Sequence, residues 1–536
     1  MTGSEEIKAA FSTPPDKHVE QSKNAVEKIF ELAKAKCDFY KTEDGRAFVS
    51  YYSSPTVQEH WPISSKEFQY TLRYWYFSNY KKMAKQESLK EVCQTLAGLA
   101  LFEGDTRQVY IRTAFVDGKW YIDLCNDKWQ VVEITAEGWR ILDQSPVPFI
   151  RAKTMKAFPT PVRGGDINEL WRFVNIPKNC QLLVLGWIVD ALRQDTQKPV
   201  LELLGDHGSG KSHLTEMVRS LTDPSTAPLR NLPDSEQAFF VSCQYTWVVT
   251  IENRSDLSGR EQDLLCQVST GSAYVKRTSH SDADETVLQA LRPQIINGIT
   301  AMATRMDLID RCVSIELEAL PDNQRKSKKC LEEEYAEAHP RILGALFQLI
   351  ADALKVLPEI KLENPPRLVD FGYMGEAVGR VMGSQHSFND LLRANKKELI
   401  LTSLETSPVC MALIKLCENS QSDLVYRGNY AGLLSRLEPY RPRSSVGWVT
   451  SGKGLANALK RHAAGFHEVG INLICPKADD PRNSHGKLVT VELLPGYKRA
   501  VSALPTPGYQ AQSAHSEVSE PKKPDNSGDM LTERVI

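Results

Sequence analysis

Between positions 200 and 212 the chain reads Val200-Leu201-Glu202-Leu203-Leu204-Gly205-Asp206-His207-Gly208-Ser209-Gly210-Lys211-Ser212. The first five residues are mostly apolar and predict a buried strand, and the last eight match the phosphate-binding loop (P-loop) pattern G-x-x-x-x-G-K-[ST] in full. Glycines let consecutive backbone N–H groups point inward at phosphate oxygens, and the helix predicted over 212–220 turns its positive end toward the same anion. A chance glycine-rich turn is the alternative, but the order of strand, loop and helix favours phosphate binding.

The loop predicts a site for ATP and Mg²⁺. Lys211 is expected to reach the β- and γ-phosphates, and Ser212 to offer its hydroxyl to the metal. Such a site also needs a second strand that ends in a carboxylate, which holds the metal or activates water. Residues 247–251 predict this strand, and Glu252 follows it directly. A surface glutamate after a core strand is the alternative interpretation of Glu252.

Two further strands carry polar residues that the same site can use. The strand predicted over 294–296 ends in Asn297, whose amide can contact the γ-phosphate or position water, although Asn-Gly is also an ordinary turn. Arg311 stands just before the apolar strand 313–317, where it can reach the nucleotide of a neighbouring subunit as an arginine finger. Arg305 is the second choice for that role, and an ordinary ion pair is the alternative for both.

Composition limits the class of protein. The chain has 536 residues, enough for three or four domains, and 41% of them are apolar, which excludes wholesale disorder. Its net charge of -2 excludes a generally basic protein that coats nucleic acid, but not a local basic patch. The 11 cysteines contain no C-x-x-C pair, which argues against a zinc ribbon. The chain shows no signal peptide and no membrane span, so we expect a cytoplasmic protein.

Changes in composition and in apolar patterning along the chain predict a multidomain α/β protein. Asp44-Gly45 and Asp117-Gly118 each separate two apolar runs, the pattern of a β-hairpin. A strand is also predicted over 239–242. The expected units are a flexible N-terminus (1–24), an α+β domain (25–155), a linker (156–178), the P-loop α/β core (179–320), a helical region (321–410), a winged-helix-like domain (421–495) and a disordered tail (496–536).

With these motifs in order, residues 180–495 resemble the ATPase region of superfamily-three helicases and of phage and plasmid primase-helicases, within the AAA+ class. They look similar to P-loop ATPases of prophages and integrated elements. The resemblance rests on Glu252-Asn253 and on five segments: 110–112, 121–124, 264–271, 292–298 and 307–311. It implies an AAA+-like core, a homo-oligomer such as a hexameric ring, and DNA, single-stranded or forked, as the partner.

One departure from that family weakens the prediction of hydrolysis. The helicases usually end the second strand with two acidic residues, whereas this chain has Glu252-Asn253. A neutral asparagine cannot act as a general base, so hydrolysis is expected to be slow unless Asp256 or Asp263 helps. ATP binding is therefore the safer expectation.

Two regions predict contacts with DNA. In superfamily-three helicases a β-hairpin carries Lys and His into the central channel, and by position Lys276, Arg277 and His280 fit this role. Residues 421–495 contain ten Lys/Arg and six Asp/Glu, with Lys453, Lys460 and Arg461 between apolar helix positions. A helix followed by two strands resembles a winged-helix domain, whose recognition helix can enter a major groove. The alternatives are a solvated hairpin and a winged helix that binds protein.

These features favour an ATP-dependent ring motor on DNA, a replicative helicase-like protein of a mobile element. A second interpretation keeps the ATPase without unwinding: a nucleotide switch in an anti-phage defence or regulatory complex. A third, non-enzymatic interpretation is a DNA-binding adaptor whose P-loop binds nucleotide structurally. Strand displacement on a forked duplex separates the first from the second, and phosphate release separates the third.

Overall fold

The computed structural model of the chain describes residues 24–277, 285–319, 327–443, 447–476 and 488–497. At its centre is a sheet of four parallel strands in the order β13-β8-β12-β9. These strands are β8 (Val200–Gly205), β9 (Val249–Arg254), β12 (Gln294–Gly298) and β13 (Cys312–Leu317). β8 is buried along its whole length, because sheet neighbours flank it on both sides. The expected mixed α/β architecture with a parallel sheet is confirmed.

Register brings the carboxyl ends of the central strands to one edge. Val200 lies opposite both Gln294 and Cys312, and Gly205 lies opposite Leu317. The loop that follows β8 therefore leaves the sheet beside the ends of β12 and β13. In open parallel sheets, ligands bind at this carboxyl edge.

Helices connect the strands and cover the sheet. They are α5 (Gln181–Ala191), α6 (Lys211–Thr222), α7 (Glu236–Cys243), α8 (Gly259–Thr270) and the short α9 (Met306–Ile309). The strand predicted over 239–242 was wrong, because these residues belong to α7. The hydroxyl of Ser235 accepts the backbone N–H of Ala238 and caps the helix, while Phe239, Phe240 and Cys243 are buried at helical spacing.

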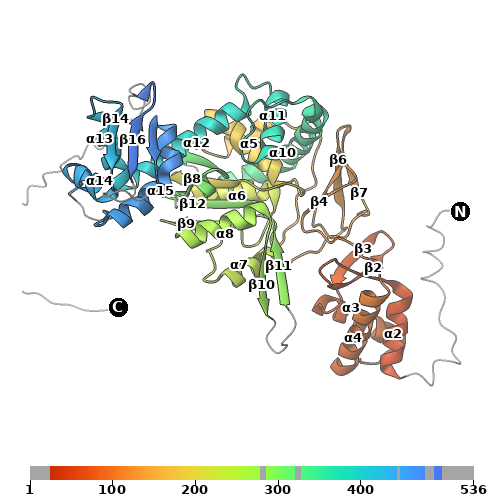
Figure 1. Ribbon diagram of the computed structural model, residues 1–536. Coiled ribbons are helices and arrows are strands. Elements are labelled where there is room, and N and C mark those ends of the chain that lie inside the picture. Colours follow the sequence, from red (N-terminus) through yellow and green to blue (C-terminus); the bar gives the residue numbers. More distant parts are fainter. Residues whose placement is uncertain (1–23, 278–284, 320–326, 444–446, 477–487, 498–536) are drawn as a thin grey trace, which may run out of the picture.

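A helical region follows the sheet. It contains α10 (Lys328–Val356), the 3-10 turn η4 (Leu357–Glu359), α11 (Val369–Val381), α12 (Phe388–Glu405) and α13 (Pro408–Glu418). α5, α10 and α11 pack together and share one hydrophobic core with α6 and the central sheet (Figure 1).

The N-terminal part contains two sheets that pack against different hydrophobic cores. Antiparallel strands β1 (Cys37–Lys41), β2 (Ala47–Ser54) and β3 (Val57–Pro62) pack with α2 (Ala25–Lys36), α3 (Lys66–Tyr80) and α4 (Gln86–Phe102) around their own core. The second sheet consists of β4 (Thr113–Val116), β5 (Lys119–Asp123), β6 (Val131–Thr135) and β7 (Gly138–Leu142). Both hairpins expected at Asp-Gly turns are present, as β1–β2 and β4–β5.

The second sheet shares its core with the central region. Trp120, Ile122 and Ile134 belong to the same buried cluster as α5 and α10. The segment 156–178, expected as a linker, contains the 3-10 turn η1 (Ile167–Arg172) and is followed by η2 (Lys178–Cys180). Five of its apolar residues are buried in that cluster: Phe158, Ile167, Leu170, Phe173 and Ile176. The boundary expected at 155 stays a prediction, whereas the buried contacts continue across it.

Two more elements complete the described chain. β10 (Ser272–Arg277) and β11 (Glu285–Ala290) form an antiparallel hairpin that projects away from the central sheet in Figure 1. The C-terminal part combines β14 (Leu424–Gly428), α14 (Tyr430–Leu437), η5 (Glu438–Tyr440), α15 (Gly452–Glu468), β15 (Ile471–Ile474) and β16 (Val489–Leu493). Its three strands are antiparallel in the order β14-β16-β15, and β14 was not expected from the sequence.

Candidate nucleotide site

The loop after β8 has a backbone that only glycine allows at several positions. Gly205, Gly208 and Gly210 have φ values of +147°, +82° and +87°. A Cβ on Gly205 would lie 2.5 Å from the carbonyl oxygen of Leu317 and 2.7 Å from the hydroxyl of Ser209. Gly205 is therefore required by close packing against β13 as well as by its backbone conformation, whereas Gly210 has open space around it and is favoured by its backbone conformation alone.

Lys211 begins α6 and folds back over the loop. Its Nζ donates to the carbonyl oxygens of Gly205, at 2.5 Å, and Asp206, at 2.8 Å. Partial burial lowers the pKa of Lys211, while the charge of Asp206 acts in the opposite direction. The ammonium group is thus held at the mouth of the loop, where the N-terminus of α6 also points.

Ser212 and Glu252 come together from two different elements. The Ser212 hydroxyl on α6 donates to Oε1 of Glu252 on β9 at 2.5 Å. A hydroxyl and a carboxylate are hard oxygen donors, and Mg²⁺ prefers one or two such protein ligands together with water and phosphate oxygens. This donor set fits the Mg²⁺ that the sequence predicted.

Asn297 lies at the end of β12 and bridges the two elements that carry this pair. Its residue is 2% exposed, its Oδ1 accepts the backbone N–H of Asn253 at 2.8 Å, and its Nδ2 donates to the Thr215 hydroxyl at 3.1 Å. Asn253 has a φ of +53°, an uncommon conformation that the bond from Asn297 supports. Asn297 therefore positions β9 against α6, and contact with a γ-phosphate stays a prediction.

A cavity of about 380 Å³ opens beside the loop. It is lined by Pro177, Gly205, Asp206, Ile299 and the segment 316–319. Pro177 and the segment 316–319 were not predicted as lining residues. Only the pairing of Leu317 with Gly205 brings the segment 316–319 beside the loop. The volume lies in the range of small-molecule sites.

A buried ion cluster anchors the far end of α6. Asp223, directly after the helix, accepts Nε of Arg112 at 3.0 Å and a guanidinium N–H of Arg219 at 3.4 Å. Both arginine side chains are at most 1% exposed. Asp223 also accepts the backbone N–H groups of Trp247 and Val248 at 3.2 Å, just before β9. This cluster ties the second N-terminal sheet, α6 and β9 together.

The two arginines expected near a neighbouring nucleotide differ in exposure. Arg311 lies at the amino edge of the sheet, opposite the P-loop, and its side chain is 7% exposed and ion-paired with Asp307 at 2.6 Å. For Arg311 the structure therefore has the local ion pair, which was the alternative to an arginine finger. Arg305 is 42% exposed and paired with Asp263 at 2.8 Å, and the side chain of Gln262 holds its backbone N–H. Asp263, which the sequence offered as a carboxylate that could help Glu252 in hydrolysis, is therefore ion-paired with Arg305.

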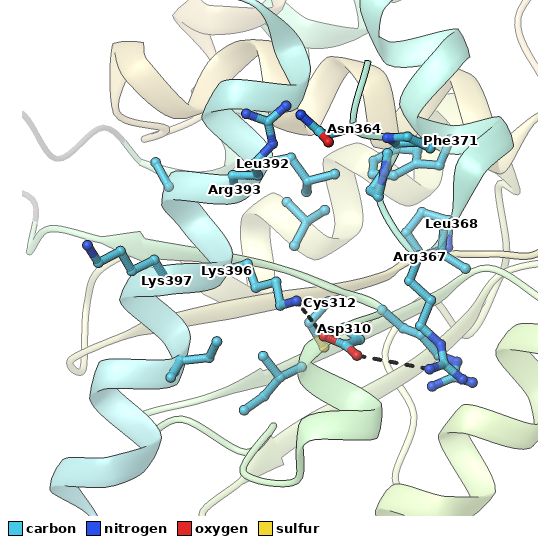
Figure 2. A pocket seen from close by; sticks show the side chains of 18 of the residues that line it. Asp310, Cys312, Asn364, Arg367, Leu368, Phe371, Leu392, Arg393, Lys396 and Lys397 are labelled. Carbon is cyan, nitrogen blue, oxygen red and sulfur yellow. Dashed lines mark ion pairs between the residues drawn. The ribbon is translucent and has the colours of Figure 1, made fainter. Parts of the chain in front are cut away.

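Arg311 also lines a second cavity, of about 450 Å³, on the side of α12. There Asp310 lies between two cations, Lys396 at 2.7 Å and Arg367 at 4.0 Å (Figure 2). These ion pairs join the start of β13 to the segment before α11 and to α12. The cavity is thus a junction between the sheet and the helical region, separate from the P-loop.

The residues expected to contact DNA lie on two distant elements. The backbone of Lys276 and Arg277 belongs to β10, opposite Thr286 and Glu285, and His280 lies outside the described residues. Lys453, Lys460 and Arg461 are exposed on α15, whose other face buries Leu455, Leu459 and Phe466. The DNA-contacting roles of both sets stay predictions.

Among the described residues, no group of three or more His, Cys, Asp and Glu side chains is arranged to hold a metal ion. No single described helix is long and apolar enough to cross a membrane. Helices α12 and α13 together have the length and composition of a membrane span, but the chain bends by 102° between them.

Comparison with known proteins gives one family and several distant structures. No curated protein matches the chain. A solved structure titled as the active helicase Cch of SCCmec type IV is 11% identical, with a TM-score of 0.41, over 87% of this chain and 94% of that one. The apo A form of the NrS-1 C-terminal region is 12% identical, with a TM-score of 0.39, over 87% and 98%. The segment 167–391, which contains the P-loop, Glu252 and Asn297, matches the family model of the actinomycete integrative conjugative element replication protein.

Proposed function

We propose that the chain is an ATP-dependent motor that acts on DNA during replication of a mobile element. The observation that carries the proposal is that Ser212 donates to Glu252 at the carboxyl edge of the parallel sheet, next to Lys211, which lies over the loop. These are the groups that a nucleotide with Mg²⁺ requires, and they lie beside a cavity of suitable size. The match of this segment to a replication-protein family supports the choice of DNA as the substrate.

The site has a clear division of tasks. The loop N–H groups and Lys211 would bind the phosphates, and Ser212 and Glu252 would hold the metal, whose charge would offset that of the phosphates. Asn297 keeps Glu252 in place through its bonds to Asn253 and Thr215. Glu252 remains the carboxylate positioned to orient an attacking water, because Asn253 is neutral.

We further propose a homo-oligomer, such as a hexameric ring, in which Arg305 completes the neighbouring site. Arg305 is partly exposed, whereas Arg311 is buried in its pair with Asp307. The hairpin β10–β11 and the exposed cations of α15 are the proposed contacts to DNA. Two of the three positions that the resemblance assigned to the channel, Lys276 and Arg277, belong to β10.

One observation keeps a second function open: the second strand offers a single carboxylate, Glu252, followed by Asn253. A nucleotide switch without unwinding, in a defence or regulatory complex, requires ATP binding but tolerates slow hydrolysis. Phosphate release with and without single-stranded DNA, followed by strand displacement on a forked duplex, separates a motor from a switch.

The test of the proposal is titration of the full chain with ATP and Mg²⁺. Wild type is expected to bind, and Lys211→Ala is expected to lose binding, because the cation facing the β- and γ-phosphates is removed. Lys329→Ala, on the exposed start of α10 with 86% of its side chain accessible, is the matched control and should bind as wild type. Unchanged ATP affinity in Lys211→Ala would mean that the nucleotide site has been misplaced.

A further inference from the structure

Helix α3 presents a row of aromatic side chains to solvent. Tyr70, Tyr74 and Phe77 are 63%, 67% and 47% exposed. Their spacing of four and three residues places them on one face of the helix. Large aromatic side chains are normally buried or part of an interaction surface, so three in one exposed row point to a binding function.

The row is not needed to fold the N-terminal unit. The opposite face of α3 supplies the core residues Phe68, Leu72 and Tyr76, which are at most 5% exposed. Arg73 is held in place because its guanidinium donates to Gln86 at 2.7 Å, at the start of α4. The aromatic row therefore rests on a rigid helix that is already stabilised from behind.

The stretch of sequence that carries the row has an excess of positive charge. Residues 66–85 contain five Lys/Arg and one acidic residue, in a chain whose net charge is -2. The basic residues are Lys66, Arg73, Lys81, Lys82 and Lys85. The acidic residue, Glu67, is ion-paired with Lys153 at 3.4 Å. Lys81 ends the helix with its Nζ 5.9 Å from the centre of the Phe77 ring.

We propose that this face of α3 binds single-stranded DNA. Bases stack on Tyr70, Tyr74 and Phe77, and Lys81 and Lys82 contact the phosphates, which is the combination that sequence-tolerant single-strand binding uses. Successive rings are offset along the helix by about 4.5–6 Å, given a rise of about 1.5 Å per residue, so each ring can take a separate base of an extended strand. A duplex does not expose its base faces, and an apolar protein partner does not account for the lysines.

In Figure 1 the N-terminal unit and the hairpin β10–β11 extend from the same side of the molecule. DNA binding by this face of α3 needs no nucleotide. It is therefore tested without ATP, and its failure differs from failure of the proposed motor.

The experiment measures binding of the full chain, without nucleotide, to labelled oligothymidylate of about 30 nucleotides, a length that spans several binding elements. Tyr70→Ala with Tyr74→Ala should weaken binding at least about tenfold, because removal of one stacking ring costs about 5- to 150-fold. Tyr70→Phe with Tyr74→Phe should bind as wild type, since the rings remain. Phe102→Ala removes an aromatic side chain that is 88% exposed at the end of α4 and serves as the matched control.

Two further readouts identify the kind of contact. Lys81→Ala with Lys82→Ala should reduce the log–log salt slope by about 1.4, at about 0.7 per phosphate contact on a single strand. Oligothymidylate carrying 5-iodouracil should cross-link to Tyr70 or Tyr74 in the wild-type protein, which tests the site even where a variant folds poorly.

Wild-type affinity of the double alanine variant together with no cross-link on α3 would overturn the inference. An equal loss of affinity for duplex and single strand would overturn base stacking. A change in sedimentation of the alanine variant with unchanged DNA affinity would assign the surface to a protein contact instead. If the wild-type protein does not turn over ATP, that counts against the proposed motor but does not affect the test of DNA binding by α3.

Discussion

Replacement of Asp223 by alanine is expected to loosen α6 and to weaken ATP binding from a distance. Asp223 is 1% exposed and lies beyond the C-terminal end of the helix that begins with Lys211. Its carboxylate is the shared counter-ion of Arg112 and Arg219. Asp223→Ala leaves two guanidinium groups buried without a carboxylate and removes the acceptor of two backbone N–H groups before β9.

The magnitude follows from what the two arginines keep. Arg112 still donates to the carbonyl oxygens of Asp123, Lys156 and Pro224. Arg219 still donates to the carbonyl oxygens of Pro228 and of residue 223 itself, and to the Thr250 hydroxyl. Removal of one partner of a buried ion pair costs about 3–5 kcal/mol, and the retained acceptors favour the lower end. Local opening of α6 should then become about 10²–10³ times more frequent. Asp223→Asn, which preserves the shape and one acceptor oxygen, should have a smaller effect.

Hydrogen exchange measured by mass spectrometry on peptides from α6 and the start of β9 tests this, because a chain of this size does not unfold in one step. The matched control is Asp105→Ala, which removes the ion pair between Asp105 and Arg107. The Asp105 side chain is 81% exposed, and such an exposed pair contributes about 0–1 kcal/mol to stability. Affinity for ATP should fall in Asp223→Ala and stay unchanged in the control. Equal exchange of α6 in both variants would refute the anchoring role of the cluster.

Three other outcomes are expected. Gly205→Ala should abolish ATP binding, since its Cβ would lie 2.5 Å from the Leu317 carbonyl oxygen; a titration that matches wild type would contradict the loop geometry. Burial lowers the pKa of His339 to about 4. Below about pH 6.5 His339 is protonated in the unfolded chain but stays neutral in the folded chain. The free energy of unfolding around α10 should therefore fall by about 3 kcal/mol between pH 6.5 and 4. His339→Phe should remove this loss in acid hydrogen exchange, and an unchanged pH profile would exclude His339. Arg305→Ala should bind ATP but turn it over about 10³–10⁵ times more slowly, with activity partly restored on mixing with Lys211→Ala; full activity alone would exclude Arg305.

Local patterns in the sequence predicted the elements whose signals are contiguous. The P-loop strand and helix, the Asp-Gly hairpins β1–β2 and β4–β5, and the parallel central sheet all follow from short runs of residues and their turns. The strand expected over 239–242 failed for the opposite reason. A short stretch with three apolar residues fits a strand or a buried helix equally well, and the Ser235 cap and the burial of Cys243 decide for the helix.

The surroundings of the candidate site were decided only by tertiary structure. Strand order places the end of β13 beside the P-loop, and 111 positions of sequence separate Arg112 from Asp223. The sequence likewise placed Arg305 and Arg311 in the same candidate role, but burial against Asp307 removes one of them from the surface. Residue types and local spacing determine which groups are available for phosphate, metal and DNA. Which of these groups meet depends on pairing between distant strands and on burial, and neither is encoded in any single stretch of the chain.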